Sequence, residues 1–264
     1  MTGFSTQLVA LGIAALLIAA AALGPSPLDS LSPISAPQAG AAEPAPVALH
    51  RETKLVFASA ERGAQHLAKS DSYLESVSAF DRQSRMQRAD DPGNEAFVNF
   101  ISAEVRDWDE ANTAKVRAAA DALRERLKPL RLPLPSEILL VRTTGREEGE
   151  AAYCRGPSII LPDKVLARGG LDRLLAHELF HVLSNQNAEL RRKMYAVVNY
   201  QVCDEIPLPA SLRPRKITNP DGPKLDCVVP LKLADRQLLA APLLLASVDK
   251  FDPKQGGSFF RYLQ

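Results

Sequence analysis

The segment HELFH, from His177 to His181, constrains this chain more than any other stretch. It lies within residues 171–184, where apolar residues recur with the period of an α-helix, so we expect a helix there. In a helix, positions i and i+4 lie on one face about 6 Å apart. The leucines and the valine of residues 171–184 form an apolar arc along this helix, and the two histidines lie on the opposite side. The histidines should therefore face a cleft or solvent.

Two imidazoles on one helical face are suited to binding a metal ion. Both can reach one zinc ion at about 2.0–2.1 Å. Glu178 is rotated about 100° from His177, which is too far to join them as a ligand but suitable for a base beside a water molecule. The pattern predicts a zinc hydrolase site with His177 and His181 as metal ligands and Glu178 as the catalytic base.

A zinc site of this kind requires a third protein ligand. No histidine follows His181, so the downstream candidates are acidic: Glu189, Asp204, Glu205, Asp221 and Asp226. We prefer Glu205, which follows His181 by 24 residues and leaves room for a second helix to return a carboxylate to the metal. The following Ile206 is biased away from helical geometry by Pro207. The other four acids stay open as alternatives.

Other polar residues are weaker candidates for the site. Cys154 could in principle complete a site of two histidines and one cysteine. Tyr195 is a candidate catalytic donor to a developing oxyanion, and Tyr262 is a second. The proline-bounded loop at 215–223 could line a substrate subsite.

The remaining pattern predicts an α+β fold. Residues 48–135 read as a helical segment, with helices at 94–108 and 111–127. After LPLP at 132–135, the runs 137–142 and 151–161 are β-prone and predict a hairpin or two neighbouring strands. A further strand pair is expected at 227–233 and 237–248. Residues 136–264 would then form the catalytic domain.

With β-prone runs before an HExxH helix, the sequence resembles the zincin superfamily of metallopeptidases, and a gluzincin-like member in particular. The resemblance covers about residues 137–206, and LLAHELFHVLS is its specific part. It implies a zincin-like catalytic domain, Zn²⁺ as cofactor, and a peptide or protein as substrate. It also implies that the edge strand before the helix, here 151–160, binds the substrate backbone.

The N-terminus indicates export. Residues 8–23 form an uninterrupted apolar run of 16 residues, shorter than a comfortable membrane span. Residues 1–24 are thus expected to be a signal peptide or an N-terminal anchor, followed by a linker rich in proline and alanine at 25–47. The chain would be periplasmic or secreted, with membrane contact only through an uncleaved anchor. A net charge of +1 gives no reason to expect nucleic acid as a partner.

Together these features predict an exported zinc-dependent peptidase. Two alternatives stay open: an envelope-associated binding or scaffold protein that retains zinc without turnover, and a zinc amidase acting on peptidoglycan. The three cysteines could form one disulfide at most, and the sequence does not choose the pair.

Overall fold

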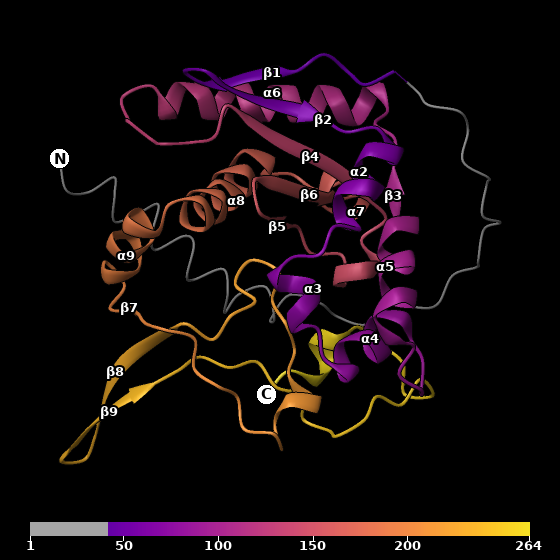
Figure 1. The fold of residues 1–264 in the computed structure, drawn as a ribbon. Helices are drawn as coiled ribbons and strands as arrows, with labels where there is room; N and C mark the ends of the chain where they lie inside the picture. Colours follow the sequence, from indigo (N-terminus) through magenta and orange to yellow (C-terminus); the bar gives the residue numbers. More distant parts are fainter. Residues whose placement is uncertain (1–41) are drawn as a thin grey trace.

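A computed structural model describes residues 42–264, and its centre is a six-stranded mixed sheet (Figure 1). The strands are β1 (Val47–His50), β2 (Thr53–Phe57), β3 (Val105–Arg106), β4 (Glu137–Thr143), β5 (Tyr153–Arg155) and β6 (Ser158–Pro162). Their order is β1-β2-β4-β6-β5, with β3 paired to β4. β2, β4 and β6 are parallel, whereas β1 and β5 are antiparallel strands at the two edges.

The central strands are apolar because both faces of the sheet are covered. β6 is buried along its whole length, as expected for a strand in the interior of a layered fold. The strand predicted at 137–142 is confirmed as β4. The run at 151–161 divides into β5 and β6 at Gly156, whose φ of 58° suits the start of a tight hairpin turn. β4 and β6 are therefore neighbours, but they are parallel and do not form a hairpin together.

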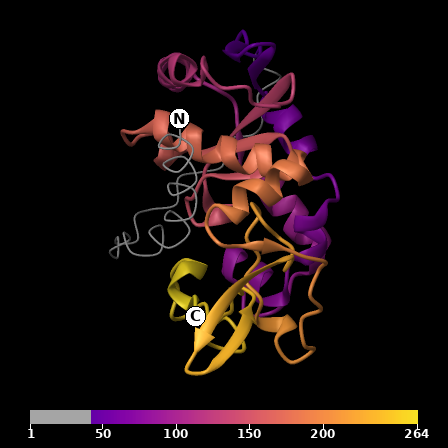
Figure 2. The same cartoon turned by 90° about the vertical axis from the view of Figure 1, so that its left-hand side faces the viewer.

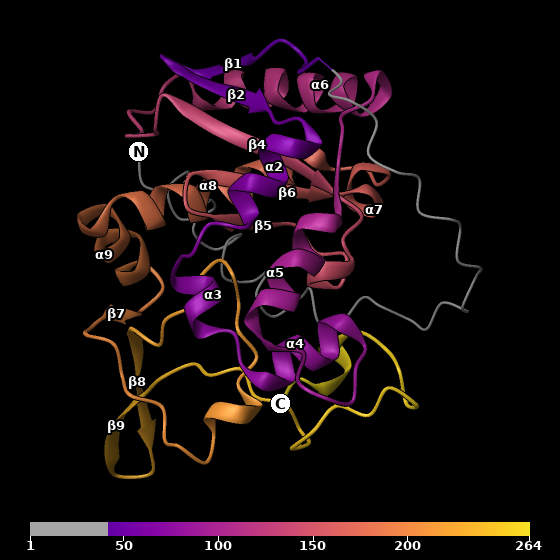
Figure 3. The ribbon, with the colours of Figure 1, turned by 45° about the vertical axis from the view of Figure 1, so that its right-hand side comes forward.

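Helices cover both faces of this sheet (Figure 3). They are α2 (Ala60–Leu67), α3 (Ser72–Ser76), α4 (Ala79–Met86), α5 (Gly93–Ala103), α6 (Glu110–Leu127), α7 (Asp163–Leu166), α8 (Leu171–Gln186) and α9 (Ala188–Ala196). α6 and α8 pack with Leu140 and Ile159 on one face. α2, α3 and α5 pack with Val141 and Ile160 on the other. The α+β class predicted from the sequence is confirmed.

The prediction of a wholly helical segment at 48–135 is wrong in two places. Residues 47–57 form β1 and β2, and β2 pairs in parallel with β4 beyond the expected boundary at 135. The helix predicted at 94–108 ends at Ala103, because Val105 and Arg106 pair with β4 as β3. Short strands of this kind are stabilised by distant partners, which local periodicity does not reveal. The helix predicted at 111–127 is confirmed as α6.

The C-terminal part lies below the main sheet and adds a second, smaller sheet (Figure 2). Its elements are β7 (Gln201–Val202), η2 (Arg213–Arg215), β8 (Cys227–Leu233), β9 (Arg236–Ala240) and η3 (Phe259–Tyr262). The strand predicted at 227–233 is confirmed, whereas its partner ends at Ala240, before Pro242. A separate apolar cluster joins this part to α4 through Phe80, Phe251 and Tyr262.

The start of the described chain is already attached to the body. Glu43 accepts hydrogen bonds from the Ser59 backbone N–H (2.9 Å) and the Arg62 side chain (3.0 Å). The predicted signal or anchor at 1–24, and the linker up to residue 41, lie outside the described residues. None of the helices within residues 42–264 combines the length and the apolar character needed to cross a membrane. The three cysteines are free thiols.

A buried ion network centred on Arg85 of α4 joins the two halves of the chain. Its guanidinium donates to both carboxylate oxygens of Glu148 (2.9 and 3.0 Å), to Asp81 and to the Thr218 carbonyl (3.0 Å). Glu148 lies at the end of η1 (Arg146–Glu148), and Tyr73 also donates to it. Asp81 in turn accepts the Thr218 backbone N–H at 3.1 Å. The loop that begins at Thr218 is thereby attached to α4.

Replacing Arg85 should therefore destabilise the whole fold. Arg85→Met would leave Asp81 and Glu148 as buried charges without a counterion, at an expected cost of about 3–5 kcal/mol in unfolding free energy. Arg88→Met is the matched control, since Arg88 forms an exposed pair with Asp90 and should leave the unfolding midpoint unchanged. Urea denaturation measures both, and equal losses would contradict a special role for Arg85.

Glu147 should make stability depend on pH. Burial raises its pKa to about 7, and the neighbouring Glu148 and Glu104 add to the effect. Between pH 4.5 and 7 the unfolded chain loses this proton while the folded chain keeps it, so stability falls by about 3 kcal/mol as pH rises. Glu147→Gln should remove this fall, which urea denaturation at pH 4, 6 and 8 would show. Parallel stability curves for variant and wild type would mean that folding does not shift the pKa of Glu147.

Candidate metal centre

The two histidines of α8 converge on one point. The predicted helix at 171–184 is confirmed as Leu171–Gln186, and the His177 and His181 Nε2 atoms are 3.1 Å apart. The opposite side of α8 packs in the apolar core with α6. His181 is nevertheless only 5% exposed, because residues of the C-terminal part cover the histidine side as well. The histidines thus face an internal cleft and not open solvent.

Asp221 is the acidic residue that the structure places beside them. Its Oδ2 atom is 3.9 Å from His181 Nε2. Its Oδ1 atom accepts the backbone N–H of Cys154 at 2.6 Å, and its own backbone N–H donates to Asn219 Oδ1 at 3.0 Å. The Asn185 side chain donates to the Asp221 carbonyl at 3.4 Å. The proline-bounded loop at 215–223, expected to line a subsite, carries Asp221 into the cleft.

Two of the three donor separations are close to those expected around a small tetrahedral ion. Ligand atoms bound at about 2.0–2.1 Å in a tetrahedron are separated by about 3.3 Å. The observed 3.1 Å between the histidines and 3.9 Å from His181 to Asp221 lie on either side of that value. Burial lowers the pKa of His181 to about 4, so its imidazole is neutral, the form that binds metals. His177, His181 and Asp221 could therefore hold Zn²⁺.

Glu178 lies beside this group and is fully enclosed. The Cys154 thiol donates to Glu178 Oε2 at 3.3 Å, and the carboxylates of Glu178 and Asp221 come within 4.8 Å of each other. Burial raises the pKa of Glu178 well above its usual range, with a further contribution from Asp221, and burial raises the pKa of Asp221 to about 6. Among residues 42–264, neither carboxylate has a lysine or arginine as ion-pair partner. A fully buried acid next to a largely buried one, with no cationic side chain paired to either, favours a bound cation.

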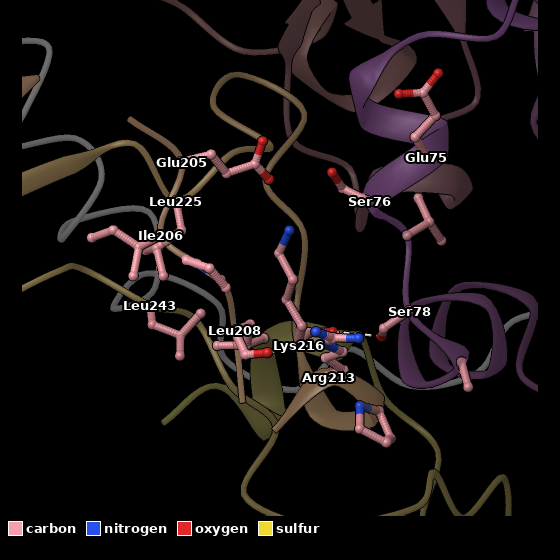
Figure 4. Close-up of a pocket in the computed structure, with 14 residues that line it drawn as sticks. Glu75, Ser76, Ser78, Glu205, Ile206, Leu208, Arg213, Lys216, Leu225 and Leu243 are labelled. Carbon is pink, nitrogen blue, oxygen red and sulfur yellow. Dashed lines mark hydrogen bonds between the residues drawn. The ribbon is translucent and has the colours of Figure 1, made fainter. Parts of the chain in front are cut away.

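The prediction of Glu205 as third ligand is not supported. After α9 the chain turns into β7, which pairs with β8, and the Ile206 N–H then donates to the Leu225 carbonyl. Glu205 consequently lies exposed, 3.6 Å from Lys224, at a separate cavity of about 570 Å³ that contains Lys216 (Figure 4). α9, the helix that follows α8, ends at Ala196, and the chain after it joins β7 and does not return to the histidines.

The other acids proposed as ligands are also placed elsewhere. Glu189 forms an exposed pair with Lys193, and Asp226 pairs with Arg191 on α9. Asp204 is exposed. Of the five acids named from the sequence, Asp221 alone has an observed contact with the histidine pair.

The prediction of Tyr195 as a catalytic donor is not supported either. Its ring stacks on Phe180 at 6.2 Å, and Phe180 packs edge-on against His181 at 5.5 Å. Tyr195 therefore supports the metal-binding side of α8 through an intervening ring. The Tyr262 hydroxyl donates to the Gly256 carbonyl and is part of the apolar cluster below the sheet.

Sequence reasoning missed the part that β5 plays. Cys154, considered from the sequence as a metal ligand, lies with Glu178 and Asp221 in a group whose ligand atoms are all within 4.8 Å of one another. Its backbone N–H also orients Asp221, and its thiol contacts Glu178. A small cavity of about 140 Å³ lies beside this strand. His177, Asp221, Asn219, Tyr153, Ala151 and Ala152 line it together with the apolar residues Ile217, Leu244, Phe259, Phe260 and Leu263.

Comparison with protein-family models, with curated proteins and with solved structures finds no match to this chain. The class of the protein is therefore inferred from its own residues and their geometry.

The zinc affinity of two variants should show whether Asp221 or Glu205 is the third ligand. We expect about one zinc per chain, and Asp221→Asn should weaken zinc affinity by more than about 100-fold, because it removes a charged ligand. Glu205→Gln, a matched loss of one carboxylate, should leave the affinity unchanged. Competition titration with a chromophoric chelator measures both.

Substituting the histidines tests whether they bind zinc or only contact each other. A hydrogen bond between the two Nε2 atoms, with one ring as donor, would also explain their separation of 3.1 Å. His177→Ala and His181→Ala should each abolish zinc binding if the pair holds metal. Full zinc occupancy in the double variant would reduce the pair to a structural contact.

Proposed function

We propose that this protein is an exported zinc-dependent peptidase with a zincin-like catalytic domain. The observation that carries the proposal is that His181 lies 3.1 Å from His177 and 3.9 Å from Asp221, which in turn lies within 4.8 Å of the buried carboxylate of Glu178. This set supplies two neutral nitrogen ligands, one anionic ligand and an adjacent base. Export is inferred from the apolar run at residues 8–23.

The chain's own residues would divide the work of hydrolysis between them. Zinc, when bound, polarises the scissile carbonyl and lowers the pKa of water. Glu178 accepts the proton of the attacking water and passes it to the leaving amine. A raised pKa suits this role, since the carboxyl group must both take up and release a proton near neutral pH. The Cys154 thiol holds one oxygen of Glu178 in place during the transfer.

The resemblance to zincins implies that the strand before the HExxH helix binds the substrate backbone, and here that strand is β5. β5 is the antiparallel edge strand of the main sheet, and Cys154 connects it to α8. All three of its residues are buried, and the Cys154 N–H on its outer edge is already bonded to Asp221. A peptide that adds to this edge by backbone hydrogen bonds would therefore compete with Asp221 for it.

A donor to the developing oxyanion is still needed, and Tyr195 does not reach the cavity. Asn219 lines the cavity next to His177 and lies on the loop that carries Asp221. Its side-chain oxygen is fixed by the Asp221 N–H, which orients the amide group. We assign the donor role to this amide in the proposed reaction.

Replacing Glu178 should lower the hydrolysis rate without changing zinc binding. Glu178→Gln should retain the fold and the zinc but lower the hydrolysis rate by about 10²–10⁴-fold, the usual contribution of a positioned base. A peptide-library digest read by mass spectrometry measures this, with Glu189→Gln as the control on an exposed acid. Unchanged turnover in Glu178→Gln would show that another base operates.

Two other outcomes would replace the proposal. Wild-type protein that holds zinc but cleaves neither peptides nor peptidoglycan fragments would be a binding or scaffold protein. Cleavage of peptidoglycan fragments alone would make it an amidase with the same metal chemistry.

A further inference from the structure

The hairpin of β8 and β9 exposes leucines far from the metal centre. Five cross-strand pairs hold it together, and it extends away from the body of the molecule (Figures 1 and 2). Leu231, Leu233, Leu238 and Leu239 are 49%, 67%, 40% and 65% exposed. They make up most of the large apolar side chains exposed within the described part of the chain. A concentration of this kind on one thin element marks an interaction surface.

The leucines lie on both faces of the hairpin. Leu231 is paired with Leu238, so these two share one face with Leu233, whereas Leu239 is paired with Pro230 and lies on the other. A folded protein docked against one face would leave the other leucine in water. A fluid apolar medium that surrounds the end of the hairpin covers both faces at once.

The charges of the hairpin fit the surface of a bilayer. Lys232 and Arg236 lie next to the leucines and are exposed, and Asp235 is the acidic residue between them. Long cationic side chains can keep their charge at lipid phosphates while their stems and the neighbouring leucines enter the acyl boundary. The unpaired outer edge of β9 confines such insertion to the hydrated interface, because open strand edges do not occur in the hydrocarbon core.

We propose that the β8–β9 hairpin is a membrane-docking element that inserts its leucines into the interface of a bilayer containing anionic lipid. This membrane docking does not depend on zinc or on the proposed peptidase activity. Its occupant is the lipid surface itself, which the two-faced leucines and the adjacent cations favour over a second copy of the chain.

Tryptophan placement tests the insertion in the full chain. Trp108 is the single tryptophan and is 8% exposed. Because Trp108 is buried, a lipid-dependent change in fluorescence reports the surroundings of an introduced, exposed tryptophan. Leu233→Trp should shift to shorter emission wavelength and be quenched by brominated lipid in vesicles of phosphatidylcholine and phosphatidylglycerol. The matched control is Ala118→Trp, an exposed position on α6 at the opposite end of the molecule (Figure 1). It should show neither effect, even where the apolar N-terminus itself binds the vesicles.

Charge substitution and protein concentration complete the test. Leu239→Asp in the Leu233→Trp background should lower vesicle partition of the hairpin by about 10-fold to 100-fold, the equivalent of one leucine side chain. Three results would overturn the proposal: no lipid quenching of Leu233→Trp, equal quenching of Ala118→Trp, or a blue shift that needs no lipid and grows with protein concentration. The last would identify a second copy of the chain as the partner.

Discussion

The buried guanidinium of Arg85 is the contact on which the rest of the structure depends. It binds Glu148 before β5, Asp81 on its own helix, and the Thr218 carbonyl of the C-terminal loop. These groups come from segments up to 133 residues apart in sequence. Because charged groups buried this completely require full pairing, the network tolerates one arrangement of the three segments. That arrangement places the loop carrying Asp221 over the histidines of α8.

The site itself is organised by the exclusion of water. Glu178 and His181 are buried, and burial opposes the charged form of each of them. The result is two carboxyl groups that either carry a proton or bind a cation, beside a neutral imidazole. In the proposed reaction a divalent ion would restore charge balance in this largely enclosed site, and the low local dielectric would strengthen its effect on a bound carbonyl. The covering loop thus contributes both a candidate ligand and the environment that makes the ligand set useful.

Local signals predicted some elements well and others poorly. α6 and α8 are long amphipathic helices, so their own periodicity defines them. β4 was visible as an apolar run ended by turn residues. β1, β2 and β3 were not, because each has only two to five residues, and β2 and β3 also pair with β4, which is distant in the chain. Glu205 was chosen by assuming that a helix leads back to the metal, whereas α9 ends after nine residues and the chain joins a second sheet.

The sequence by itself determined that the two histidines lie together with Glu178 between them in the chain, because a spacing of four residues on one helix brings imidazoles together whatever the rest of the chain does. It also determined the α+β class through its changing periodicity. Only the tertiary structure shows which of the five acids lies beside the histidines, and that acid is Asp221. Asp221 follows His181 by 40 residues, and its position depends on the Cys154 backbone and on the Arg85 network. Those contacts join segments that no local pattern connects, so only the folded chain could bring the third donor to the site.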